Sequence, residues 1–274
     1  LKTYKTNVLA CMILSTSNEK GKFDIEPGDT FLYALAPLPY TTGLIPLGLK
    51  DEIDVEFLPP VSEAVNMTFS ERNKRGFKLG MKKGIDFFFG LGSVAYYVCL
   101  SVAAMSEGGK GGSKLKALMS MSPSMTLRYL NAKQTCRKEN RDLKPKDLFT
   151  LKGFVCAGTD NRCYKDDLED LWGVRPIEVF SGTEPSCIGI ETWSRNGLYF
   201  FPDTCFYEFM PEEEMYRNME DPSYCPRTFC MDEVQVGEVY EIVLTVFKGG
   251  AFARYRVGDM YRCVGLTSRE DETR

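Results

Sequence analysis

The fold of this chain is decided by residues 179–184, which read VFSGTE. An apolar strand is expected over residues 174–180, and the small residues that follow it predict a tight turn. That turn presents the hydroxyl of Thr183 and the carboxylate of Glu184. These two groups at the end of a strand indicate a ligand site, and the structural alternative is a capped turn with a surface carboxylate.

A second apolar run, residues 152–159, also ends in small residues, namely Ala157, Gly158 and Thr159. Between the two runs, residues 164–172 carry apolar side chains at helical spacing. The order strand, helix, strand predicts a βαβ unit with parallel strands. Ligands bind outside the carboxyl ends of such strands, so both small-residue turns are candidate site segments.

The first half of the chain shows the same alternation of elements. Strands are expected at residues 30–36 and 54–58, and an apolar helix is expected to start at residues 44–49. A basic helix is predicted over residues 68–84; its charges fit a solvated face, with a phosphate- or CoA-attracting patch as the alternative. These elements predict an α/β fold in which parallel sheets are flanked by helices.

Residues 87–105 contain no charged side chain. Their length would admit a transmembrane helix, but glycines, serines and a tyrosine pair dilute the run. We therefore expect a strand at residues 87–90, Ser93 as N-cap, and a buried helix over residues 94–105. The glycine-rich residues 106–114 are expected to form a flexible linker rather than a phosphate loop.

The last third is predicted to be a smaller antiparallel β region. Residues 239–247 alternate between apolar and other side chains, and residues 252–257 are expected to return as the hairpin partner. Gly258 and Asp259 are predicted to end that second strand in a tight turn.

Further side chains of this region have more than one interpretation. Arg254 and Arg256 flank Tyr255 on the opposite face of the strand, which favours salt bridges over an anion contact. The aromatic run at residues 199–209 favours core packing over an acyl pocket.

Composition excludes several classes of function. The 274 residues include no histidine, so a Ser-His-Asp or Cys-His hydrolase is excluded within this chain. The net charge of −4 predicts no attraction to nucleic acid or to anionic membranes. The ten cysteines include no C-x-x-C pair, which favours free thiols in a reducing cytoplasm over a zinc site.

Two motifs then connect the chain to a known family. Residues 180–184, FSGTE, resemble a motif of adenylate-forming enzymes that consists of an aromatic residue, a glycine, and a serine or threonine followed by a glutamate. Residues 255–259, YRVGD, match a form characteristic of the auxin-responsive Gretchen Hagen family of acyl-acid amido synthetases, which has bacterial relatives. Residues 202–211 resemble the aromatic strand of that family, and residues 28–43 resemble its strand and loop after the phosphate loop. The resemblance is strongest over residues 151–266.

The resemblance implies a role for each matching position. Ala157, Gly158 and Thr159 would line the adenine pocket, and Phe180 would stack on the base. Other positions expected to line the nucleotide are Ser181, Gly182 and Tyr255.

Three polar groups carry the chemistry that the resemblance implies. Thr183 would contact the α-phosphate as a catalytic residue, and Glu184 would help to hold Mg²⁺. Asp259 would accept hydrogen bonds from both ribose hydroxyls. A hydroxyl, a hard carboxylate ligand and a carboxylate facing a diol suit these roles.

The implied activity is ATP-dependent activation of a small carboxylic acid as an acyl-adenylate, followed by transfer to an amine. The alternatives are transfer to CoA, or a non-catalytic nucleotide-binding remnant. The expected cofactors are ATP or AMP and Mg²⁺, and neither nucleic acid nor membrane is expected as a partner. In-line attack on phosphorus depends on positioning and charge neutralisation, so the missing histidine is no obstacle.

The resemblance also implies a domain organisation. Residues 1–150 would form one α/β subdomain without its phosphate loop, and residues 151–266 the nucleotide-binding α/β and β subdomain. Residues 267–274 would begin the hinge to a C-terminal lid domain that the chain lacks. We therefore expect a chain truncated at both ends, processed or partial, and weak or inactive alone.

Overall fold

In a computed structural model of the chain, the structure describes residues 2–105, 121–158, 161–247 and 252–266. The chain divides into two compact units, each described here by itself. The larger contains Leu1–Ser181 and Gly189–Tyr199, and the smaller contains Gly182–Ile188 and Phe200–Arg274.

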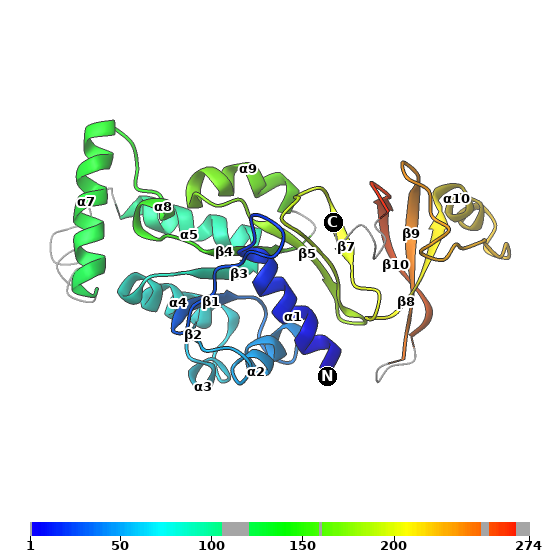
Figure 1. Cartoon of the computed structure of the whole chain (residues 1–274), viewed down its shortest axis with the longest axis horizontal. Coiled ribbons are helices and arrows are strands. Elements are labelled where there is room, and N and C mark those ends of the chain that lie inside the picture. Colours follow the sequence, from blue (N-terminus) through cyan, green and yellow to red (C-terminus); the bar gives the residue numbers. More distant parts are fainter. Residues whose placement is uncertain (1, 106–120, 159–160, 248–251, 267–274) are drawn as a thin grey trace. The chain divides into compact units, whose positions relative to one another are not determined.

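A seven-stranded sheet is the centre of the larger unit (Figure 1). Its order is β2-β1-β3-β4-β5-β6-β7, and neighbouring strands from β2 to β5 pair in parallel. The strands are β1 Asp29–Ala34, β2 Val55–Leu58, β3 Phe87–Leu91, β4 Gly153–Ala157, β5 Ile177–Gly182, β6 Ser186–Glu191 and β7 Leu198–Phe200. The predicted α/β class is therefore confirmed.

Helices connect these strands. The helical segments are α1 Lys2–Ser15, η1 Thr41–Leu44, α2 Ile45–Leu49, α3 Val61–Ala64, α4 Phe69–Lys83, α5 Gly92–Ala104, α7 Pro123–Glu139, α8 Pro145–Leu148 and α9 Asn161–Trp172. The helix α9 joins β4 to β5, as the sequence predicts for a βαβ unit. Figure 1 shows α5 and α9 on one face of the sheet and α1 on the other.

The core on the α5 and α9 face is strongly aromatic. The rings of Phe88, Phe154 and Trp172 lie 5.4 to 5.6 Å apart, and each side chain is at most 1% exposed. Leu168 and Trp172 are fully buried, which confirms the apolar face predicted for α9. Each such side chain contributes about 2–3 kcal/mol on burial.

The boundary predicted at residue 150 does not separate the two units. It lies inside the larger unit, where β3 pairs with β4 in parallel from one side of that boundary to the other. The sheet core makes these segments one body, because their strands share hydrogen bonds. The functional assignment of residues 1–150 and 151–266 stays a prediction, and residues 267–274 lie outside the described residues.

The apolar stretch at residues 87–105 forms β3 and α5. Ser93 is not the N-cap, because α5 already begins after Leu91, which makes no side-chain capping bond. The helix is buried on one side only: Tyr97 is 63% exposed and Leu100 54%. Among the helices in the described part of the chain, none has the length and apolar composition needed to cross a bilayer. The expected linker at residues 106–114 falls outside the described residues.

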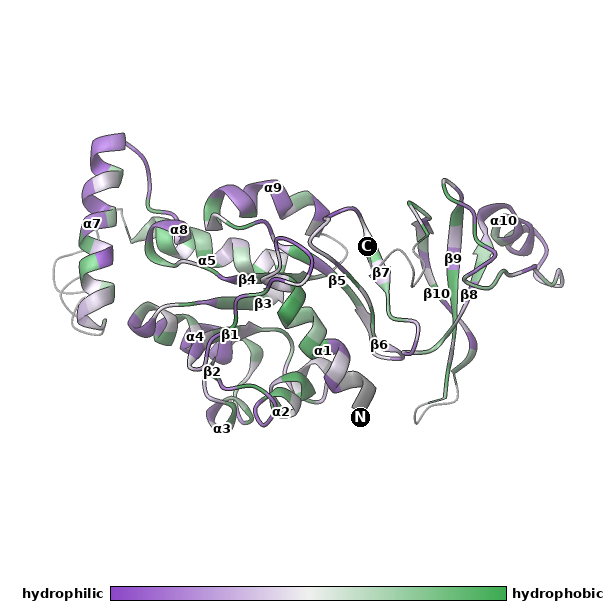
Figure 2. Cartoon of the chain, viewed as in Figure 1, coloured by the Kyte–Doolittle hydropathy of each residue, from purple (hydrophilic) through white to green (hydrophobic). Residues whose placement is uncertain are grey.

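The smaller unit is built on an antiparallel sheet of order β10-β9-β8. Its elements are β8 Phe206–Pro211, α10 Glu212–Glu220, β9 Val239–Val246 and β10 Phe252–Arg262. The rings of Phe200, Tyr207 and Phe209 stack at 5.7 to 6.4 Å, and Tyr207 and Phe209 are buried, as expected for a core role. The same run also contains Tyr199 and Phe206, which are 37% and 49% exposed and lie outside the core. Figure 2 shows hydrophilic residues concentrated on α7, α9 and α10.

Candidate functional site

Two of the predicted segments end neighbouring strands of the larger unit. Ala157 ends β4 and is 8% exposed, and Gly158 follows with a φ of +117°, a conformation that favours glycine. Ala157 is paired with Val179, so the half-buried Phe180 lies one residue further along β5. The structure therefore brings Ala157, Gly158 and Phe180 together where β4 ends beside β5. Thr159 lies outside the described residues.

The hydroxyl and carboxylate of the opening motif lie in the turn between β5 and β6. Ser181 is exposed near the end of β5, and Thr183 is exposed within the turn. A side chain at Gly182 would place its Cβ 3.2 Å from Glu184 Oε2. The glycine therefore leaves room for this carboxylate, which is half-buried.

Glu184 lies close to a tyrosine of the second motif. The Glu184 carboxylate raises the pKa of the Tyr255 hydroxyl on β10. Both residues belong to the smaller unit, although about seventy residues separate them in the sequence. Parts of the two motifs thus lie close together in the folded chain.

Asp259 lies in a β-bulge rather than at a strand end, so the prediction that β10 ends at Gly258 and Asp259 is wrong. Arg256 faces Val243 and Met260 faces Glu241, so residues 257–259 lie opposite a single residue of β9. Gly258 has a φ of +86°, and β10 continues to Arg262. A bulge turns the backbone without ending the pairing, and it commonly redirects a side chain next to a site.

The carboxylate of Asp259 is available to a ligand. The side chain is half-buried, and it forms no ion pair or hydrogen bond with the described residues. A partner-free acid in a bulge is consistent with the predicted contact to a diol.

The two arginines beside Tyr255 form ion pairs, as predicted. Arg254 Nη2 lies 3.1 Å from Glu208 Oε1. Arg256 donates from Nε at 2.8 Å and from Nη2 at 2.5 Å to the carboxylate of Glu241, which is 3% exposed. Each of these guanidinium groups is therefore already paired within its own sheet.

A buried ion-pair network supports the larger unit, and sequence reasoning missed it. Lys165 on α9 lies 2.7 Å from Glu191 and 3.0 Å from Glu178, and Lys165 and Glu191 are each 7% exposed. Glu191 also accepts the backbone N–H of Glu178 at 2.7 Å. The network ties α9 to β5 and β6. The one signal in the sequence is a single glutamate in each of the apolar strands β5 and β6; Lys165 stands among several other charges of α9, so nothing in the sequence identifies it as their partner.

Glu184 is the one carboxylate for which a cation role is predicted. Among the described residues, there is no cluster of three or more cysteine, aspartate or glutamate ligands. Mg²⁺ bound with a nucleotide uses one or two carboxylates together with phosphate oxygens and water. Glu184 fits that mode as a single carboxylate ligand.

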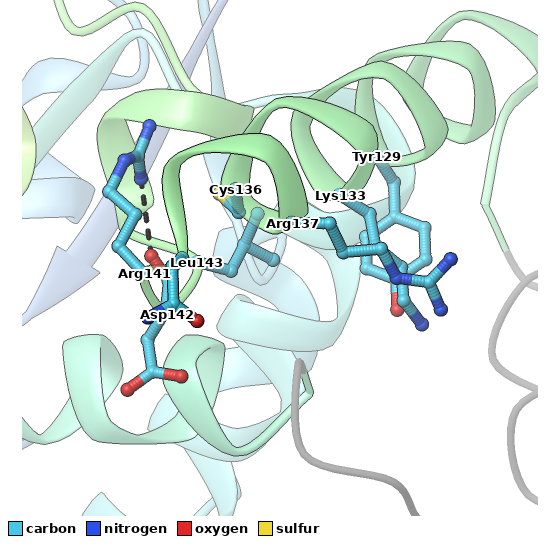
Figure 3. Close-up of a pocket in the computed structure, with 8 residues that line it drawn as sticks. Tyr129, Lys133, Cys136, Arg137, Arg141, Asp142 and Leu143 are labelled. Carbon is cyan, nitrogen blue, oxygen red and sulfur yellow. Dashed lines mark hydrogen bonds between the residues drawn. The ribbon is translucent and has the colours of Figure 1, made fainter.

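A pocket of about 340 Å³ lies on the surface of α7 (Figure 3). Tyr129, Lys133 and Arg137 line it at helical spacing, and Arg141 donates two hydrogen bonds to Asp147 at 2.8 and 2.9 Å. None of the predicted site residues lines this pocket. It therefore does not support the candidate site.

Comparison with known proteins begins with the motif-bearing smaller unit. Residues 198–270 match the model of the GH3 family central domain. This range contains Tyr255 and Asp259, and the match confirms the resemblance to the Gretchen Hagen enzymes that the two motifs indicate. No curated protein sequence matches the chain.

Solved structures extend the likeness to the whole fold. A GH3.15 acyl acid amido synthetase in complex with 2,4-DB superposes with a TM-score of 0.57 and 14% identity, over 97% of this chain and 48% of that one. A 2-hydroxyisobutyryl-CoA ligase in complex with 2-HIB-AMP and CoA gives 0.50 and 17%, over 94% and 44%. The chain thus spans about half the length of these proteins. It has the fold of adenylate-forming enzymes, as the sequence predicts.

Proposed function

We propose that the protein is part of an adenylate-forming ligase, which activates a small carboxylic acid with ATP and passes the acyl group to an amine. One observation carries the proposal: Glu184 of the FSGTE motif lies close to Tyr255 of the YRVGD motif and raises its pKa. Parts of two nucleotide-type motifs that are distant in sequence thereby lie together in the smaller unit, which also holds Asp259. The family match over residues 198–270 favours an amine acceptor.

The reaction places few chemical demands on the protein. A carboxylate oxygen of the acid attacks the α-phosphorus of ATP, the new O–P bond forms, and pyrophosphate leaves with the electrons of the broken P–O bond. No proton is transferred in this step, so positioned donors and charge neutralisation suffice.

Four residues of the smaller unit have a proposed role in this reaction. Asp259 accepts the two ribose hydroxyls, and Thr183 donates its hydroxyl to an α-phosphate oxygen. Glu184 orients Mg²⁺, which when bound neutralises phosphate charge. Tyr255 orients the Glu184 carboxylate from close by. The contacts of Ala157, Gly158 and Phe180 with adenine stay predictions, as does a cytoplasmic location.

Transfer to CoA is the second candidate. The fold of the chain is also similar to that of a 2-hydroxyisobutyryl-CoA ligase, so transfer to CoA is compatible with the fold. Fold alone does not distinguish the two acceptors. Product analysis with CoA and with amino acids, each offered singly, distinguishes a thioester from an amide.

Nucleotide binding tests the proposed site. AMP binding, measured by calorimetry, should weaken about tenfold or more in Asp259→Ala, because charge-assisted hydrogen bonds contribute about 1.5–3 kcal/mol each. Asp232→Ala removes an exposed acid from the same unit and is the matched control. Equal AMP affinity for Asp259→Ala and Asp232→Ala would show that the ribose assignment is wrong.

A further inference from the structure

Arg72 on α4 is a buried cation whose donors lack partners. Its side chain is 4% exposed, and neither Nε nor Nη2 has a hydrogen-bond partner among the described residues. Carboxylates close to it in sequence are already used: Glu71 accepts the backbone N–H and the hydroxyl of Thr68, and Glu63 pairs with Arg75. Burial without a counter-ion lowers the pKa of Arg72.

The two unpaired nitrogens form one edge of the guanidinium group. Nε–H and Nη2–H point the same way, and this spacing matches two oxygens of a carboxylate or a phosphate. The face of the group is used separately, because it lies 5.3 Å from the centre of the Tyr33 ring. Tyr33 is itself fixed, since its hydroxyl donates to the carbonyl of Thr42. Stacking therefore holds the cation in place and leaves the two buried donors of this edge without an acceptor.

The position of Arg72 in the fold is that of a ligand site. It lies in the first turns of α4, the helix that leads into β3 from the side of β2. Tyr33 is near the carboxyl end of β1, and it extends past the edge strand, because β2 stops at Leu58 opposite Leu32. Ligands of parallel α/β sheets bind at these carboxyl ends.

The energetics disfavour a purely structural role for this arginine. A buried charge without hydrogen bonds is costly, and an arginine does not escape the cost by losing its proton. Replacing such a group by an apolar side chain is commonly neutral or stabilising. Retaining an arginine here is explained if an anion supplies the missing acceptors.

We propose that the Nε–Nη2 edge of Arg72 binds an oxyanion, a carboxylate or a phosphate group, of a ligand located at the carboxyl end of β1. This proposal rests on the proposed function and extends it. Under that function the acid substrate carries a carboxylate, and the nucleotide and CoA carry phosphate groups. The binding itself is measurable without any activity of the enzyme.

Thermal unfolding of the 274-residue chain in sodium phosphate, sodium acetate and sodium chloride, at constant ionic strength, tests the proposal. The wild type should be stabilised saturably by phosphate or by acetate relative to chloride. Arg72→Met should lose that saturable rise, and its affinity for the anion should fall about thirtyfold or more. In chloride, its melting temperature should equal or exceed that of the wild type. Arg75→Met, which removes an exposed arginine of the same helix, should keep the anion effect.

Arg72→Lys covers the case in which Arg72→Met fails to fold. Lysine keeps the charge and loses the planar edge, so anion affinity should fall about tenfold. The proposal is overturned if neither anion stabilises the wild type saturably, or if Arg72→Met or Arg72→Lys responds like the wild type. It is also overturned if Arg72→Met is less stable in chloride and responds to anions unchanged, which would indicate a hydrated structural arginine.

The source of the oxyanion follows from two Michaelis constants. In ATP–pyrophosphate exchange, Arg72→Lys should raise KM for the acid alone if the acid supplies the group, and KM for ATP alone if the nucleotide supplies it. Failure of exchange in every variant would count against the proposed function, whereas the anion-dependent melting would still decide the role of Arg72.

Discussion

The carboxylate of Glu241 is buried in the smaller sheet and accepts two N–H groups from Arg256. These bonds raise the pKa of Arg256. In the neighbouring pair, the side chain of Arg254 is 55% exposed and that of Glu208 13%, whereas the side chain of Arg256 is 36% exposed and that of Glu241 4%. We expect the pair of Arg256 to contribute more, because its carboxylate is the more deeply buried of the two.

We expect Arg256→Met to lower the free energy of unfolding by about 3 kcal/mol, since it leaves Glu241 buried without its partner. Arg254→Met should cost less than about 1 kcal/mol. Urea denaturation of both variants measures the difference. Equal losses would show that burial of Glu241 does not decide the strength of its pair.

Tyr255 and Glu184 give a pH-dependent prediction. The raised pKa of Tyr255 means that its hydroxyl holds its proton more firmly beside the Glu184 carboxylate. This contact stabilises the unit below the ordinary tyrosine pKa of about 10 and is lost as pH rises through the raised value.

In an NMR titration of tyrosine Cζ, the signal missing from Tyr255→Phe should titrate above the ordinary value. In Glu184→Gln the same signal should titrate closer to it, because the negative charge has been removed. Glu238→Gln, at an exposed acid of the same unit, is the control. An unchanged titration in Glu184→Gln would show that Glu184 is not the partner of Tyr255.

Among the elements, the loop between β1 and α2 folds back on itself, and the carbonyl of its Thr42 accepts the hydroxyl of Tyr33, whose ring lies beside Arg72. The hydroxyl of Thr42 donates to the carbonyl of Ala36 at 2.8 Å. A Cβ at Gly43 would lie 2.3 Å from the backbone nitrogen of Leu38. This glycine is required by close packing of backbone on backbone.

Gly43→Ala should therefore destabilise the chain by about 1–3 kcal/mol, because backbone atoms cannot move aside cheaply. Gly48→Ala is the matched control in α2, where the nearest atom to the new Cβ is Lys5 Cγ at 3.7 Å. There we expect a gain of about 0.5–1 kcal/mol from helix propensity. Similar urea midpoints for the two variants would contradict the close approach at Gly43.

The same scale explains which features the sequence predicts. The buried positions Tyr240, Ile242 and Leu244 of β9 follow from local alternation. Glu241 and Val243, on the other face, are buried as well, which residue order does not indicate. The bulge at Asp259 depends on how β10 pairs with β9, and no local pattern encodes that register. Ser93 misleads for a related reason: a capping residue type is present, but tertiary packing starts the helix earlier.

The candidate site, too, is predictable from the sequence only in part. Residue types and order indicate Thr183, Glu184 and Asp259, because a hydroxyl and two acids recur at turn-forming glycines. The proximity of Tyr255 and Glu184 is visible only once the chain is folded, since the two residues belong to distant elements. Arg72 escapes notice for the opposite reason: within a basic helix it looks like one more surface charge, and burial alone distinguishes it.

For the whole molecule, fold and family likeness point in one direction. The chain has the adenylate-forming fold, and its smaller unit carries the GH3 central-domain match and the meeting of the two motifs. Adenylate formation is the central claim that these observations support, and the acceptor is secondary to it.

ATP–pyrophosphate exchange tests that claim most directly. The assay uses a panel of aliphatic and aromatic carboxylic acids, on the 274-residue chain and on the product of its complete gene. The account predicts exchange that depends on one class of acid, falls about tenfold or more in Asp259→Ala, and is unchanged in Asp232→Ala. No exchange with any acid by the complete product, or equal exchange in Asp259→Ala and Asp232→Ala, would contradict it.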